Sequence, residues 1–139
     1  MERFESFVSY ITELHRLIQR LKNSQTAHLG LEGKHVMVLN YLRANPEGLT
    51  GAELCSLCGE DKAAISRTLA DLESRGLIDR QHGYRAKICL TDEGLSLAEK
   101  VKELSDRVVE AGGAGLTDEQ RQNLYFALDT ITKNLEKLC

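Results

Sequence analysis

Small and basic side chains share one face of a helix that is predicted over residues 61–75. Hydrophobic residues at helical spacing, Ile65, Leu69 and Leu72, form a stripe that should be buried. The opposite face then carries five other residues: Lys62, Ala63, Ser66, Arg67 and Ala70. Small side chains let a helix approach the DNA major groove closely, a methyl group can contact a thymine methyl, and Lys or Arg can pair with guanine or phosphate. The alternative is a solvated helix face with two ordinary surface cations.

The neighbouring elements favour the DNA interpretation. A shorter helix is predicted before this one, with Thr50 as its N-cap and Gly59 as the left-handed residue that ends it. Two short strands, 77–81 and 85–90, are predicted after it, joined at the tip by His82, Gly83 and Tyr84. Helix, turn, helix and hairpin follow one another in this order in a winged helix-turn-helix, where the second helix enters the major groove and the hairpin reaches the backbone or minor groove.

The remaining chain is predicted to be helical. Its 139 residues allow one domain. We expect a mainly α fold with a small β-hairpin wing, in which a winged-helix DNA-binding core spans about 34–91. The flanking segments, about 3–22 and 92–139, are predicted to be dimerisation helices, with a break at the glycines of 112–115.

The net charge is slightly negative, from 18 basic and 21 acidic residues, and this excludes a protein coated in basic charge. The charge is unevenly distributed. Residues 60–90 hold six basic and five acidic side chains (+1), residues 91–139 hold six and ten (−4), and residues 1–59 balance to zero. Only the segment expected to contact DNA is positive. Because the excess is small, we expect weak non-specific affinity and a modest salt dependence per subunit.

Two stretches carry a resemblance to a known family. The run DKAAISRTL at 61–69, followed by LESRGLIDR at 72–80, resembles the recognition helix and first wing strand of MarR-type transcriptional regulators. Leu90 and Thr91, followed by Glu93 and Gly94, resemble that family's entry into its long penultimate helix. The resemblance covers essentially the whole chain. It implies a homodimeric repressor or activator that binds double-stranded DNA, with interlocking terminal helices and a small-molecule effector pocket between the dimerisation and DNA-binding regions.

This chain departs from the family pattern at two places. Ala63 and Ala64 stand where the family commonly has hydroxyl side chains, so base readout is expected to depend on Lys62, Ser66 and Arg67. The wing tip is shorter than the family's usual tip. This makes Arg85 the first candidate for the wing arginine and Lys87 the next.

The hydrophobic stripes of the outer helices also predict a dimer on physical grounds. They are wide, and the chain has too little other core to cover both of them. A twofold dimer would place two recognition helices about one turn of DNA apart, which matches a palindromic operator. The alternative is that the two helices pack against each other within one chain.

Cysteine and histidine positions allow other hypotheses. Cys55 and Cys58 share a helix face and could form a redox pair or half of a soft-metal site, with a weaker resemblance to the metal-sensing helix of ArsR-type repressors. The plainer interpretation makes both of them small core residues, and no metal site is predicted. His28 and His35 flank a loop and are expected at the surface.

Several function classes are disfavoured. No Ser-His-Asp, Cys-His or paired-carboxylate arrangement stands out, so we expect neither an enzyme nor a cofactor. The start of the chain does not resemble a signal peptide, and no hydrophobic run is long enough to span a membrane, so a cytoplasmic protein with reduced cysteines is expected. A winged helix that serves only as a protein-interaction module remains the rival from a different class.

Overall fold

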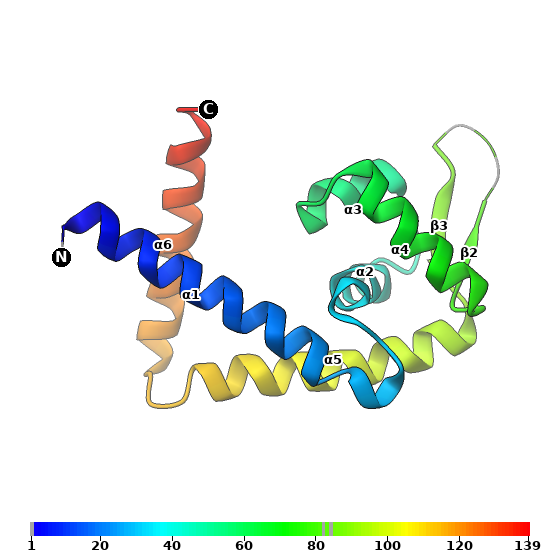
Figure 1. Ribbon diagram of the computed structural model, residues 1–139, viewed down its shortest axis with the longest axis horizontal. Coiled ribbons are helices and arrows are strands. Elements are labelled where there is room, and N and C mark those ends of the chain that lie inside the picture. Colours follow the sequence, from blue (N-terminus) through cyan, green and yellow to red (C-terminus); the bar gives the residue numbers. More distant parts are fainter. Residues whose placement is uncertain (1, 82, 84) are drawn as a thin grey trace. The chain divides into compact units, whose positions relative to one another are not determined.

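The computed structural model describes residues 2–81, 83 and 85–139, and Figure 1 shows the path of the chain. These residues form six α-helices, one short 3-10 helix and three strands. The helices are α1 (Arg3–Ser24), the 3-10 helix (Ala27–Leu29), α2 (Gly33–Ala44), α3 (Gly51–Cys58), α4 (Lys62–Ser74), α5 (Asp92–Gly112) and α6 (Asp118–Glu136). The strands are β1 (Leu49–Thr50), β2 (Ile78–Arg80) and β3 (Lys87–Leu90). The predicted class, mainly α with a small β wing, is confirmed.

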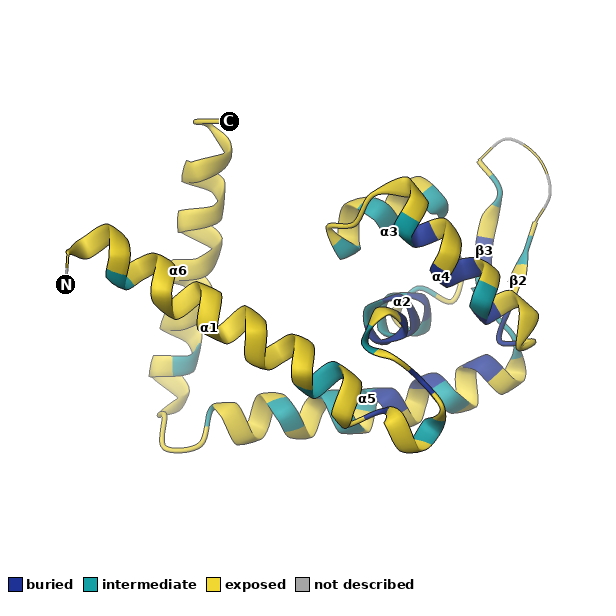
Figure 2. Cartoon of the chain, viewed as in Figure 1, coloured by how far each residue is buried: buried dark blue, intermediate teal, exposed yellow. Residues whose placement is uncertain are grey.

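The chain divides into two compact units, Met1–Ser105 and Asp106–Cys139. The hydrophobic core belongs to the first unit, where α2, α3, α4, the sheet and the first half of α5 meet. Its fully buried residues include Leu39, Leu54, Leu72, Ala98 and Val101. Figure 2 shows the dark blue buried residues concentrated in α2, α4 and the adjoining part of α5. The periodic stripes of the sequence therefore define the core of a winged helix.

The wing is part of a three-stranded antiparallel sheet with the order β1-β3-β2. Ile78 lies opposite Leu90, and Leu49 lies opposite Ile88. The β2–β3 hairpin agrees with the prediction, whereas β1 was not expected, because two residues are too few to show an alternating pattern. His82 and Tyr84, at the predicted tip, lie outside the described residues.

Hydrogen bonds hold the beginning of α5 against the segment that joins α4 to β2. The Thr91 hydroxyl donates to the Gly76 carbonyl at 2.7 Å and accepts from the Gly94 N–H at 3.0 Å. The Thr91 N–H donates to the Leu77 carbonyl at 3.1 Å. Gly94 is buried against that carbonyl, and a Cβ at Gly94 would lie 1.9 Å from the Leu77 oxygen. Only glycine lets the two backbones approach this closely.

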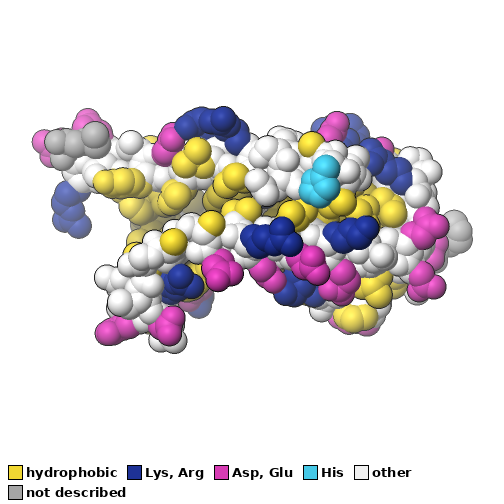
Figure 3. All heavy atoms as spheres, turned by 90° about the horizontal axis from the view of Figure 1, so that it is seen from below, with side chains coloured by type: hydrophobic (Ala, Val, Ile, Leu, Met, Phe, Trp, Pro, Cys, Tyr) yellow, Lys and Arg dark blue, Asp and Glu magenta, His cyan; other side chains and the backbone are white. Residues whose placement is uncertain are grey.

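Neither α1 nor α6 has a buried residue. Both carry large hydrophobic side chains that are exposed in the single chain. On α1 these are Phe4, Phe7, Val8, Tyr10, Ile11, Leu14, Leu17 and Ile18, and on α6 they are Leu124, Tyr125, Phe126, Leu128, Ile131 and Leu135. Figure 3 shows hydrophobic side chains, in yellow, reaching the surface along the outer helices. In the described part of the chain no helix is both long and hydrophobic enough to cross a membrane.

Candidate nucleic-acid interface

Helix α4 presents the predicted DNA-facing side chains to solvent. Asp61 is its N-cap residue, and the Asp61 carboxylate accepts from the Ala64 N–H at 2.7 Å. Four residues of α4 are buried: Ile65, Thr68, Leu69 and Leu72. The five residues of the opposite face are all exposed: Lys62, Ala63, Ser66, Arg67 and Ala70. The amphipathic division matches the sequence pattern, while contact of this face with DNA stays a prediction.

Helix α3 and the turn after it position α4. The Thr50 hydroxyl accepts from the Glu53 N–H at 3.1 Å, and the Glu53 carboxylate lies near the Thr50 N–H at 3.4 Å, which forms a capping box at the start of α3. Gly59 ends α3 with a left-handed φ of 64°. This turn lets α3 and α4 pack together as the two helices of a helix-turn-helix.

The wing lies beside α4. The Arg80 guanidinium on β2 forms an ion pair of 3.3 Å with the Glu73 carboxylate on α4, which connects the wing to the candidate recognition helix. Lys87, the first residue of β3, and Arg85, before that strand, are both exposed. Arg85 has a φ of 55°, a backbone conformation that non-glycine residues rarely adopt and that occurs preferentially at functional sites. The two wing candidates are thus accessible, and their role stays a prediction.

His35 contradicts the sequence expectation, because its side chain is fully buried. Its Nδ1 accepts from the Glu32 backbone N–H at 2.9 Å, and its Nε2 lies 2.5 Å from Asp71 Oδ2 on α4. Asp71 also pairs with Arg75 at 3.4 Å, and Arg75 donates to the Gly30 carbonyl at 2.5 Å. The available sequence signal was the position of His35 three residues after the N-cap Glu32, where a side chain can bond back to the cap. His28 is exposed, as expected.

The pKa of the Asp71 carboxyl is below its ordinary value of 3.8, chiefly because His35 donates a hydrogen bond to it; burial opposes this shift, and the charge of Arg75 adds to it. A carboxyl with a lowered pKa in the folded state stabilises the protein above its ordinary pKa, and this stabilisation is lost as the pH falls through the lowered value. In Asp71→Asn, the free energy of unfolding should therefore decrease less as the pH is lowered. Between about pH 6 and about pH 2.5, the urea midpoint should fall less in Asp71→Asn than in wild type, and an equal fall would contradict this assignment.

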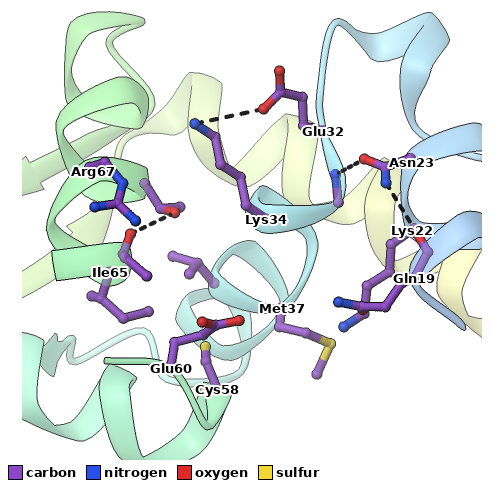
Figure 4. A pocket seen from close by; sticks show the side chains of 14 residues that line it. Gln19, Lys22, Asn23, Glu32, Lys34, Met37, Cys58, Glu60, Ile65 and Arg67 are labelled. Carbon is purple, nitrogen blue, oxygen red and sulfur yellow. Dashed lines mark hydrogen bonds and ion pairs between the residues drawn. The ribbon is translucent and has the colours of Figure 1, made fainter. Parts of the chain in front are cut away.

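A cavity of about 470 Å³ lies between the C-terminal end of α1, the start of α2 and the α3–α4 region. Figure 4 shows Lys22 and Arg67 facing it from opposite sides, with Met37 at its wall and Lys34 paired to Glu32 at 3.7 Å. Among the residues that the structure describes, neither Lys22 nor Arg67 has a side-chain hydrogen bond or ion pair. Glu60 also lines the cavity, so its charged residues, Lys22, Lys34 and Arg67 against Glu32 and Glu60, leave a net charge of +1. Arg67 belongs to the predicted DNA-facing surface.

The two cysteines of α3 are free and half-buried. Cys58 lines the cavity, and burial, followed by the nearby charge of Glu60, raises the pKa of its thiol. A raised pKa disfavours the thiolate that redox chemistry and metal binding require. In the described part of the chain, no group of three His, Cys, Asp or Glu residues is placed to hold a metal ion. A sensing role for Cys55 and Cys58 stays a hypothesis.

Comparisons with known proteins agree with this geometry. Residues 29–86 match the model of the MarR family. The chain is 22% identical over 126 residues to the uncharacterised HTH-type transcriptional regulator YybA of Bacillus subtilis (strain 168), covering 88% of this chain and 83% of that protein.

Two solved structures have the same fold. The S. aureus MepR–DNA complex has a TM-score of 0.85 and 19% identity, covering 96% of this chain and 99% of that one. CouR from Rhodococcus jostii RHA1, bound to p-coumaroyl-CoA, has a TM-score of 0.78 and 24% identity, covering 88% of each chain.

Proposed function

We propose that this chain, whose residues 29–86 match the MarR family, is a MarR-family transcriptional regulator that binds double-stranded DNA sequence-specifically through α4 and the wing. The observation that carries the proposal is the exposed face of α4, where small side chains surround Lys62, Ser66 and Arg67. These three residues enter the major groove, Arg67 as a candidate for two hydrogen bonds to guanine. Arg85 and Lys87 contact the DNA from the wing.

The protein acts as a homodimer in this proposal. The hydrophobic side chains along α1 and α6 are 36–77% exposed, and such continuous hydrophobic surface usually marks an interface. The partner is a second copy of the chain, because in a twofold dimer the hydrophobic surface of each copy covers the same surface of the other. The dimer then presents two α4 helices to two half-sites of a palindromic operator.

A small-molecule effector that occupies the cavity and releases the protein from DNA is the regulatory part of the proposal. Support comes from the cavity's size, which is in the range of small-molecule sites, and from CouR, which binds a ligand within the same fold. Lys22 and Arg67 favour a ligand with a negatively charged group. Such a ligand would hold Arg67 in the cavity and away from DNA, so ligand and DNA would bind with negative coupling.

The proposal is tested by selecting binding sites from a random pool of double-stranded DNA and measuring affinity for the selected sequence against unselected DNA. Arg67→Ala should weaken binding to the selected sequence by about 10- to 100-fold, as the loss of a two-bond guanine contact would. Unselected DNA should be affected much less. Lys100→Ala, which removes one positive charge from an exposed position on α5, is the control and should change both affinities little.

Two other outcomes have distinct meanings. An equal loss on both DNAs would assign Arg67 to a phosphate contact. No sequence preference in the wild-type protein at low salt would overturn the regulator proposal and favour a protein-interaction module.

A further inference from the structure

Both ring nitrogens of the buried His35 have partners. The Nδ1 atom accepts from the Glu32 N–H at 2.9 Å, so it carries no proton in this arrangement. The ring proton must then lie on Nε2, from which it is donated to the Asp71 carboxylate at 2.5 Å. The hydrogen bonds therefore select one neutral tautomer of the imidazole, and that tautomer connects α2 directly to α4.

The hydrogen bond between His35 and Asp71 adds a directional interaction to a contact between α2 and α4 that is otherwise hydrophobic. Ile65, Leu69 and Leu72 hold α4 on the core, but hydrophobic burial is non-directional and constrains the rotation of a helix weakly. A charge-assisted hydrogen bond is short and angle-dependent, so it defines where Asp71 must lie. Arg75, the C-cap residue of α4, adds a second directional contact by donating to the Gly30 carbonyl at 2.5 Å.

Asp71 lies one helical turn after Arg67 on α4, so any rotation of α4 at Asp71 also moves Arg67. We infer that His35 is a positioning residue for the recognition helix: through its hydrogen bond to Asp71 it sets the rotation of α4 and thereby the aim of Arg67 and its neighbours at DNA. The inference rests on the proposed DNA-binding function. It assigns a role in DNA recognition to a residue that never contacts DNA.

Two conservative variants separate the two hydrogen bonds of His35. The amide nitrogen of Gln can occupy the place of Nε2, so His35→Gln keeps the bond to Asp71 and loses the acceptor for Glu32. The amide oxygen of Asn can occupy the place of Nδ1, so His35→Asn keeps the bond from Glu32 and loses the bond to Asp71. Each variant loses one buried hydrogen bond, and the thermal midpoint should fall further in His35→Asn, which loses the charge-assisted bond.

Affinity for the selected DNA should nevertheless differ between the two variants. We expect His35→Asn to lose about 10-fold or more, because the bond to the charged partner is broken. His35→Gln should retain most of the affinity. Asp71→Leu should reproduce the loss, and combining it with His35→Asn should cause little further loss, because both changes remove the same contact.

One measurement tests the tautomer of His35, and a second distinguishes positioning from general stability. The nitrogen NMR signals of His35 should show one protonated and one unprotonated ring nitrogen at neutral pH in the wild-type protein. Val101→Ala, at a fully buried position on α5, is the stability control. It should lower the thermal midpoint as the His35 variants do, while affinity for the selected DNA stays within about threefold under conditions where every variant is folded.

Equal losses of DNA affinity in His35→Asn and His35→Gln would overturn the inference. Losses that follow the thermal midpoint in all variants, Val101→Ala included, would overturn it as well, since His35 would then be an ordinary core residue. If the wild-type protein bound selected and unselected DNA equally well, the proposed function would be wrong, and the inference that rests on it would fail as well.

Discussion

Gly94→Ala should lower the free energy of unfolding by about 3 kcal/mol or more, the largest stability effect that we expect from a single added methyl group in this chain. The new Cβ would lie 1.9 Å from the backbone oxygen of Leu77, and a Cβ is fixed to its own backbone, so no flexible side chain can move away. The start of α5 would have to shift, and this would strain the hydrogen bonds of Thr91 to Gly76 and Leu77.

Urea unfolding followed by circular dichroism measures this effect. Gly112→Ala is the matched control, because Gly112 is also on α5 and a Cβ there meets nothing within 4 Å. That change should be neutral or stabilise by up to about 1 kcal/mol, because alanine favours helix. If Gly94→Ala unfolded at the same urea concentration as Gly112→Ala, the close approach of α5 to Leu77 would be wrong.

Leu128→Glu is expected to have the largest effect on DNA binding. Leu128 belongs to the exposed hydrophobic stripe of α6, which also includes Leu124, Ile131 and Leu135. A carboxylate buried in a dimer interface is strongly unfavourable, so the variant should be monomeric. A monomer engages only one half-site, and losing the linked second contact should reduce operator affinity by about 100-fold or more.

Sedimentation velocity and binding to the selected DNA should be measured on the same samples. Gln122→Glu, which adds the same charge at an exposed polar position on the other side of α6, should leave both unchanged. A Leu128→Glu protein that stays dimeric would remove this stripe from the interface. A wild-type protein that is monomeric at the concentrations that bind DNA would contradict the homodimer proposal.

Most of the secondary structure follows from short-range patterns. Residues three or four positions apart decide helix faces and caps, so the division of α4 between Ile65 and Leu69 on one side and Arg67 on the other was predictable from spacing alone. The same holds for the caps at Thr50 and at Thr117, the N-cap of α6, whose hydroxyl accepts from the Gln120 N–H at 3.1 Å. The strand β1 was not, since its two residues become a strand only by pairing with β3, 37 or more positions later in the chain.

The candidate site divides in the same way. The sequence by itself determined which side chains α4 exposes, because a 3.6-residue repeat places them opposite the hydrophobic stripe. Only the tertiary structure decided that His35 is buried against Asp71, 36 residues away, and that Lys22 and Arg67 face one cavity. Helical periodicity is a local property of the chain, whereas these pairs are made by packing between elements far apart in sequence, and no local pattern encodes that distance.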